Sequence, residues 1–175
     1  ALTFADIKAP FEAAFSAVWT GRTESDGFNR LVLELGVDWR EAALIRTLAR
    51  YRQQTGLDPS QAVQEAALRE YPTVARAILS LFKAKFDPAH GGTVAEREAL
   101  VAELNDKIIA LLQDVKSLDH DRVLRRIALL IGAIKRTNFY QVDAEGVAKP
   151  HISIKIASRE LEDLPLPKPF REIFG

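Results

Sequence analysis

Apolar side chains recur at intervals of three and four residues along most of the first 136 positions, with polar residues between them. An α-helix has about 3.6 residues per turn, so this spacing gathers the apolar side chains on one helix face. Residues that cap or break helices divide the pattern into about seven segments. We expect helices at about 10–21, 26–35, 38–56, 58–71, 72–86, 93–115 and 118–136.

The ends of these segments carry recognisable helix signals. Pro72 disfavours helical geometry in the residue before it, so the fourth helix should end at Tyr71 and Pro72 should open the fifth. Ser117 is placed to cap the last helix. Three helices begin with a polar residue followed three positions later by Glu or Gln, which is a capping box. These boxes are Asp38 with Glu41, Asp58 with Gln61 and Thr93 with Glu96.

The apolar faces predict the core. The residues expected to point inward are Phe11, Phe15, Val18, Leu44, Ile45, Leu48, Tyr51, Val74, Ala75, Ile78, Leu79, Phe82, Phe86, Leu100, Val101, Leu104, Ile108, Leu111, Leu112, Val115, Val123, Leu124, Ile127, Leu130, Ile131 and Ile134.

After Tyr140 the period changes. Residues 151–156 alternate apolar and polar, which predicts a half-buried strand, with 143–149 as the preceding turn and 139–142 as a candidate hairpin partner. The prolines of segment 164–169 favour an extended polyproline conformation, and 170–174 favour one more strand.

These patterns predict a mainly α fold: an irregular bundle of about seven helices with a small C-terminal β-hairpin or strand extension. We expect a helical domain over 1–140, with a possible sub-boundary in the loop at 87–92. Residues 141–175 should form an extended segment that leads into a further domain. A lone hairpin is marginally stable, so this segment needs the helices or further sequence to pack against.

Composition narrows the functional classes. The 24 Lys and Arg balance the 24 Asp and Glu, which argues against coating nucleic acid through bulk charge. With 47% hydrophobic residues the chain should fold, and without cysteine it has no disulfide, thiolate metal site or cysteine nucleophile. No long uncharged apolar stretch or secretory signal is present, so we expect a cytoplasmic protein without membrane contact.

Catalytic motifs are missing from the sequence. The three histidines, His90, His120 and His151, lie in separate segments without metal-ligand spacing. No serine occupies a nucleophile elbow, and no glycine-rich phosphate loop occurs. The acidic residues near 119–121 and 160–163 fit a helix start and a polar turn. We therefore expect no catalytic, cofactor-binding or metal-binding residue in this chain.

One cationic cluster stands out on the last predicted helix. Arg122, Arg125, Arg126 and Arg136 lie on one side, opposite the apolar face, and Leu129 lies among them. Three interpretations stay open: a solvated face, contact with another domain through carboxylates, or contact with an anionic partner such as nucleic acid. The lack of aromatic residues among the arginines weighs against nucleic acid.

Several stretches together resemble one family. They are Gly36-Val-Asp-Trp-Arg-Glu, Ala49-Arg-Tyr, Phe86-Asp-Pro, Asp119-His-Asp-Arg-Val-Leu-Arg-Arg, Arg136-Thr-Asn-Phe-Tyr-Gln, Ile152-Ser-Ile-Lys, and Asp163-Leu-Pro-Leu-Pro-Lys-Pro with Glu172-Ile-Phe. In order and spacing they resemble the helical region immediately ahead of the catalytic domain in large multidomain bacterial NAD-specific glutamate dehydrogenases.

The resemblance implies an intact enzyme that converts L-glutamate, NAD and water into 2-oxoglutarate, ammonia and NADH. The family's glycine-rich lysine segment and dinucleotide fingerprint have no match here, so we expect this segment to be inactive alone and to bind no cofactor. Its expected role is a scaffold or regulatory segment for the catalytic domain of the same polypeptide, in an enzyme that forms homo-oligomers. The alternative is a freestanding helical binding module. The residues expected to make the interdomain contact are Arg122, Arg125, Arg126, Leu129, Arg136, Asn138, Phe139 and Gln141.

Overall fold

Helices make up most of the chain in the computed structural model, which describes residues 2–175. The described part has seven α-helices and one three-stranded sheet, which confirms the predicted mainly α fold with a small C-terminal β extension. In chain order the elements are α1 (Phe4–Trp19), the 3₁₀ helix η1 (Gly27–Asn29), α2 (Arg30–Leu35), α3 (Trp39–Gln54), α4 (Gln61–Glu70), α5 (Pro72–Phe86), α6 (Val94–Leu112), α7 (Leu118–Ala133), β1 (Ile134–Thr137), β2 (Ile154–Ile156), the 3₁₀ helix η2 (Ser158–Glu160) and β3 (Glu172–Phe174).

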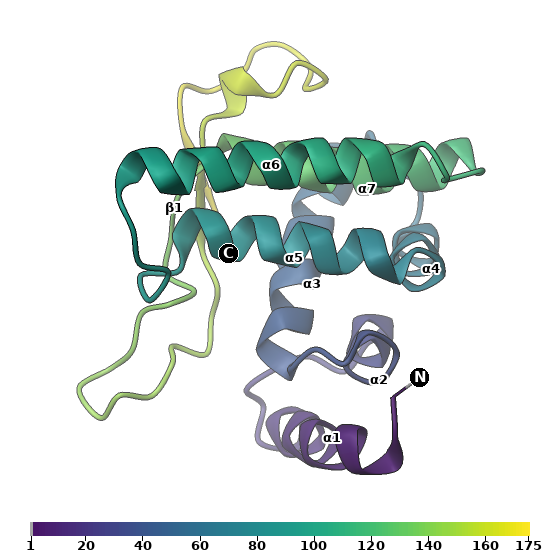
Figure 1. Cartoon of the computed structure of the whole chain (residues 1–175), viewed down its shortest axis with the longest axis vertical. Coiled ribbons are helices and arrows are strands. Elements are labelled where there is room, and N and C mark those ends of the chain that lie inside the picture. The colour runs from purple at the N-terminus through teal and green to yellow at the C-terminus, as the bar shows by residue number, and fades with distance from the viewer. Residues whose placement is uncertain (1) are drawn as a thin grey trace.

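The helices form layers around one core (Figure 1). α6 packs against both α5 and α7, and α3 contacts α7 and α4. α1 and α2 pack on each other at the lower end of the view, while the sheet lies beside the ends of α5 and α6. The sheet and α1 therefore offer two separate surfaces.

The helix boundaries follow the cap chemistry. The predicted capping box at Asp38 and Glu41 is confirmed. The Glu41 N–H donates to Asp38 Oδ1 at 2.7 Å, and the Asp38 N–H donates to Glu41 Oε2 at 3.0 Å. The box at Thr93 and Glu96 is also confirmed. The predicted box at Asp58 is wrong, because α4 starts at Gln61 and the Gln61 side chain donates to Glu65 instead.

The first helix differs most from its prediction. It begins at Phe4 rather than near Pro10, because Thr3 and Asp6 form a capping box that was not anticipated. Phe11 and Phe15, predicted to be buried, are 50% and 61% exposed, and Val18 is only half-buried. α1 instead packs through small side chains, with Ala14 and Ala17 buried.

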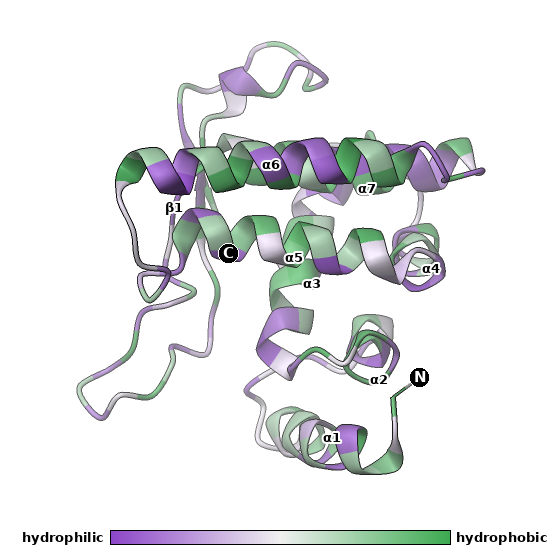
Figure 2. Ribbon diagram, viewed as in Figure 1, coloured by the Kyte–Doolittle hydropathy of each residue, from purple (hydrophilic) through white to green (hydrophobic). Residues whose placement is uncertain are grey.

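The core is otherwise close to expectation. The predicted inward residues of α3 and α7 are all buried, as are those of α5 except the half-buried Phe86. On α6 only Ile108 and Leu112 are fully buried, because this helix lies on the outside; Leu100, Val101, Leu104 and Leu111, also predicted to point inward, are half-buried. Figure 2 shows the result: hydrophilic residues are frequent along α6, whereas α5 beneath it is mostly hydrophobic.

The β extension pairs differently from the prediction. The antiparallel sheet has the order β1–β2–β3, so β2 pairs with Ile134–Thr137 and not with residues 139–142. The last helix ends at Ala133 rather than Arg136, because Ile134 adopts extended geometry and starts β1. Lys85 caps the free carbonyls of this end: its Nζ donates to Ile131 O at 2.9 Å and to Gly132 O at 2.6 Å. The chain continues directly into β1.

Two other C-terminal expectations can be compared with the structure. A strand near 170–174 is confirmed as β3. Segment 164–169 was expected to be extended but bends, with Lys168 Nζ folded back onto the carbonyls of Leu161 and Glu162. Buried residues of the C-terminal segment, such as Ile152 and Leu161, belong to the same core as the helices. The boundary expected at residue 140 stays a prediction.

Candidate interdomain surface

The sheet has one covered face and one open face. On the covered face, Ile154 and Ile156 are fully buried against the helices. On the open face, the register places Arg136 opposite Lys155 and Lys155 opposite Ile173, one residue from each strand. We call these three residues the open row. Ile173 is 75% exposed, and directly paired side chains of this kind lie about 4.5–5.5 Å apart at Cβ.

The open row carries uncompensated positive charge. Neither Arg136 nor Lys155 has an ion-pair partner among residues 2–175. The neighbouring Lys135 is different: it lies at a β-bulge, and its Nζ is 2.8 Å from Glu160 Oε2, which lowers the pKa of Glu160 below its ordinary value. Two cations and an exposed isoleucine in one row suit a partner with carboxylates around an apolar contact.

The next predicted contact residue, Asn138, holds the base of the hairpin. Its Oδ1 accepts from the Ser153 N–H at 2.7 Å, and its Nδ2 donates to His151 O at 3.1 Å. Gln141 lies further along the loop, where its Oε1 accepts from Lys149 Nζ at 2.9 Å. A shallow groove of about 190 Å³ beside the open row is lined by Arg136, Thr137, Asn138, Gln141, Ser153, Ile154, Lys155 and Ile173.

Phe139 has an internal place. It is 8% exposed, and its ring makes edge contacts with Phe82 and Tyr140 at centroid distances of 5.6 and 5.0 Å. The guanidinium of Arg40 lies 4.9 Å from the ring and donates to Phe139 O and Lys149 O. Phe139 therefore attaches the hairpin to α3 through Arg40 and to α5 through Phe82.

The arginines predicted to form one helical face are divided by the structure. Arg136 lies on β1, so it does not share a helix face with the others. Arg125 pairs with Asp121 one turn earlier, at 2.9 Å. Arg122 is exposed without an ion pair among the described residues, and Leu129 is 58% exposed. Arg122 and Leu129 are therefore the members of the α7 cluster that face outward.

Arg126 belongs to an internal charge network. Its Nη1 donates to Leu57 O at 2.5 Å and to Asp58 Oδ1 at 2.9 Å, and its Nε lies 3.2 Å from Asp163 Oδ2. The side chain of Asp58 is fully buried. Arg52, also fully buried, pairs with Asp163 from the other side. Sequence reasoning missed this network, although Arg52 lies one turn after the inward Leu48 and so on the apolar face of its helix.

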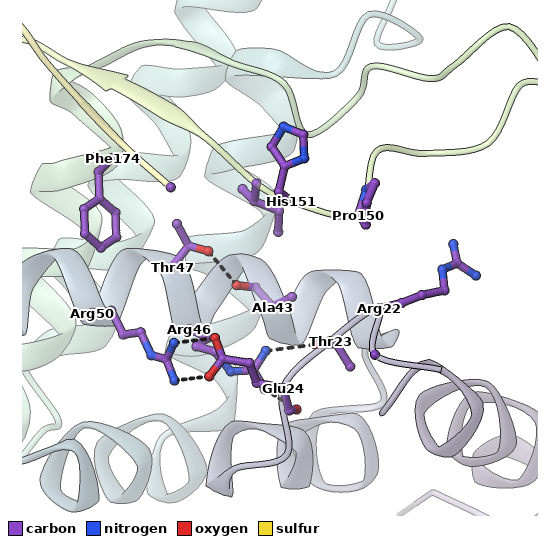
Figure 3. Close-up of a pocket in the computed structure, with 13 residues that line it drawn as sticks. Arg22, Thr23, Glu24, Ala43, Arg46, Thr47, Arg50, Pro150, His151 and Phe174 are labelled. Atoms are coloured by element: carbon purple, nitrogen blue, oxygen red, sulfur yellow. Dashed lines mark hydrogen bonds and ion pairs between the residues drawn. The ribbon is translucent and has the colours of Figure 1, made fainter. Parts of the chain in front are cut away.

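A second hollow has polar walls (Figure 3). It measures about 330 Å³ and lies between the loop at 21–24, α3 and the residues around His151 and Phe174. Arg50 donates to both carboxylate oxygens of Glu24, at 2.6 and 2.5 Å, and lowers the pKa of Glu24. Arg46 is likewise saturated by acceptors of the same loop. Because carboxylates of this chain already pair with both guanidiniums, neither is free to bind an anionic ligand. We interpret the hollow as a packing gap where three segments of the chain meet.

Among residues 2–175, no group of three or more acidic or histidine side chains is arranged to hold a metal ion. None of the described helices combines the length and the apolar character that crossing a bilayer requires.

Two family models match different parts of the chain. Residues 23–88 match the family model "Glutamate dehydrogenase, helical motif 3", and residues 107–175 match "Bacterial NAD-glutamate dehydrogenase, catalytic domain". The first region spans η1 to the end of α5, and the second runs from the C-terminal part of α6 to β3. The open row lies within the second region.

Three similar proteins are each named NAD-specific glutamate dehydrogenase. One from Halomonas elongata is 37% identical over 169 residues, or 97% of this chain. One from Mycobacterium tuberculosis is 37% identical over 94% of the chain, and one from Pseudomonas aeruginosa is 39% identical over 92%. The chain spans only 10% of the length of each of these proteins.

Proposed function

Because the chain belongs to the bacterial NAD-specific glutamate dehydrogenase family as a segment of a much longer polypeptide, we propose that it is a non-catalytic scaffold. It joins a helical motif to the beginning of the catalytic domain and positions the rest of that domain. The intact enzyme oxidises L-glutamate with NAD and water to 2-oxoglutarate, ammonia and NADH. NAD and glutamate bind to parts of the polypeptide outside this segment. The intact enzyme works in the cytoplasm as a homo-oligomer.

One observation carries the positioning role. The sheet buries Ile154 and Ile156 against the helices, while the open row on its other face exposes Ile173 and two cations without ion pairs in the described chain. β3 also has no strand on its outer edge among the described residues. Exposed strand edges and apolar residues framed by charge are typical of surfaces that another element covers.

Within this proposal the predicted contact residues have two roles. Arg122, Leu129 and Arg136 face the remainder of the enzyme, and Asn138 with Gln141 shapes the hairpin beside the open row. Arg125, Arg126 and Phe139 support the surface from within, because their partners lie inside this chain.

The test uses the full-length enzyme. Replacing Arg136 and Lys155 together by Glu reverses the charge of the open row and should lower both the rate of glutamate-dependent NADH formation and the melting temperature. Lys107→Glu together with Lys116→Glu, at two exposed positions outside the sheet, makes the same total change of charge elsewhere and should leave both unchanged. Unchanged activity and melting in the double variant would rule out the open row as a contact.

A second measurement tests the non-catalytic role directly. The purified 175-residue segment should produce no NADH from glutamate and NAD, even at high protein concentration. Detectable turnover that scales with the amount of segment would overturn the proposal.

A further inference from the structure

α1 exposes a row of aromatic side chains. Phe4, Phe11, Phe15 and Trp19 are separated by seven, four and four residues, so they fall within about 80° of the helix circumference. Their exposed fractions are 77%, 50%, 61% and 82%. The rings of Phe15 and Trp19 stack at a centroid distance of 6.3 Å. We call these four residues the α1 stripe.

The stripe is distinct from the face that packs on the rest of the chain. Ala14 and Ala17 are 8% and 2% exposed and point to the body of the protein. Small residues there bring α1 close to α2 and α3 and turn the aromatic rings outward. α1 thus has two adjacent apolar faces, of which this chain covers one.

A hollow lies beside the α1 stripe, between α1 and α2. It measures about 330 Å³ and is walled by Phe11, Phe15 and Val18 from α1 and by Val32 and Leu33 from α2. A bulky apolar side chain needs space of this kind to anchor at an interface. The rim is polar: Ser25, Asn29 and Arg30 border the hollow. Arg30 is exposed and has no ion pair among residues 2–175.

Left in water, such a surface is costly. Burial of large apolar side chains stabilises a protein, and contiguous exposed apolar patches on soluble proteins mark contact sites. The similar protein from Halomonas elongata matches 97% of this chain, so the match includes most or all of α1. It is about ten times as long as the matched stretch. Most of a polypeptide of that length lies outside this segment and is available to cover α1.

We propose that the α1 stripe and its hollow bind an amphipathic helix from another region of the same polypeptide. The apolar face of that helix covers Phe15 and Trp19, one bulky side chain fills the hollow, and a carboxylate pairs with Arg30. This contact rests on membership of a longer polypeptide but not on the scaffold role of the open row. Figure 1 shows α1 at the end of the molecule away from the layer formed by α6 and α7.

Side-chain accessibility in the full-length enzyme tests whether the stripe is covered. Hydroxyl-radical labelling followed by mass spectrometry measures how fast each aromatic ring is modified. Phe15 and Trp19 should be labelled slowly in the folded enzyme, and Phe15→Asp should restore fast labelling of Trp19. Ala13→Asp, on the opposite side of α1, places the same charge outside the stripe and should leave Trp19 protected. Fast labelling of Trp19 in the unmodified enzyme would overturn the proposal.

Crosslinking identifies the occupant. A photoreactive benzoylphenylalanine in place of Phe4 should form a crosslink to an amphipathic peptide with an acidic residue, within one subunit. Enzyme assembled from isotopically heavy and light subunits distinguishes the sources, since a crosslink within one subunit never joins heavy to light peptides. Heavy-to-light crosslinks at the stripe would show that a second copy is the occupant and would contradict the proposal. Loss of the crosslink in Arg30→Glu would support it.

Activity separates this inference from the proposed function. The loss of activity caused by the open-row double variant should be the same with and without Phe15→Asp, because the two surfaces are separate. The stripe can therefore be covered whether or not the open row proves to be a contact.

Discussion

The guanidinium of Arg46 on α3 clasps the carboxylate of Asp26 through two parallel hydrogen bonds, Nε to Oδ2 at 2.6 Å and Nη2 to Oδ1 at 2.7 Å. Arg46 is 4% exposed, and it also donates to Thr23 Oγ1 and Asn29 Oδ1. Asp26 in turn accepts the Phe28 N–H at the start of η1. One buried side chain thus fastens the loop between α1 and α2 to the centre of the protein.

Arg46→Ala should destabilise the protein by about 3–5 kcal/mol, because the nearly buried carboxylate of Asp26 loses its two short hydrogen bonds and keeps only the guanidinium of Arg50, at 3.4 Å. The matched control is Arg50→Ala, one turn further along α3. Arg50 pairs mainly with Glu24, and these two side chains are 37% and 60% exposed. It reaches Asp26 only at 3.4 Å, so its loss should cost at most about 1 kcal/mol. Urea unfolding followed by circular dichroism measures both. Equal losses in the two variants would contradict the role given to Arg46.

Arg126 should behave as an internal residue despite its place among the arginines of α7. Arg126→Gln removes the cation from the fully buried Asp58 and should cost about 3 kcal/mol in unfolding free energy. Arg122→Gln, on the same helix but exposed, should change stability by less than about 0.5 kcal/mol. Thermal unfolding of the two variants decides the point, and a stable Arg126→Gln protein would show that the network contributes little.

The helical part of the fold was largely predictable, because its signals are local. The capping box at Asp38 and Glu41 and the break at Pro72 depend on neighbours within one turn, and both were confirmed. The end of α7 was not predictable in this way. It depends on contacts distant in the sequence, namely the pairing of Ile134–Thr137 with β2 and the cap that Lys85 provides from α5, so periodicity alone extended α7 through β1.

The candidate surface was predictable only in part for the same reason. Arg136 was singled out, but Lys155 and Ile173 were not, since their alignment with Arg136 depends on the pairing of three short strands. The burial of Phe11 and Phe15 was wrong because amphipathic spacing gives the apolar side of a helix without saying what covers it. Periodicity therefore assigned Phe11 and Phe15 to the core although this chain leaves them exposed.

Asn138 should be needed for the shape of the hairpin. Asn138→Ala removes one acceptor from the Ser153 N–H and one donor from His151 O, and should cost about 1–3 kcal/mol. Hydrogen exchange at the Ser153 amide should become faster, while exchange in α7 stays slow. Gln141→Ala is the matched control, because among residues 2–175 the Gln141 side-chain amide is hydrogen-bonded only to the side chain of Lys149, so its loss should change exchange at Ser153 little. An unchanged exchange rate at the Ser153 amide in Asn138→Ala would show that the Asn138 side chain does not hold the hairpin.

Lys85 gives the stability a specific pH dependence. Burial, followed by repulsion from Lys135, lowers the pKa of Lys85 from 10.5 to about 8. In the unfolded chain the amine keeps its ordinary pKa, so between pH 8 and pH 10 the unfolded state binds more protons than the folded state. Stability then rises with pH in this interval, because the folded protein no longer holds a charge in a poorly hydrated place.

Lys85→Met isolates this effect, since methionine keeps the length of the side chain and has no charge to titrate. At pH 7 the variant loses the two hydrogen bonds to Ile131 O and Gly132 O but also the cost of the buried charge. As the pH rises from 8 to 10, the difference in unfolding free energy should move in favour of the unmodified protein, because Lys85 loses its buried charge in the folded state while the neutral amine still donates to these carbonyls. Urea unfolding at several pH values measures that difference. A difference that is flat with pH, or that moves in favour of the variant, would mean that Lys85 keeps an ordinary pKa and terminates α7 as a solvated ammonium.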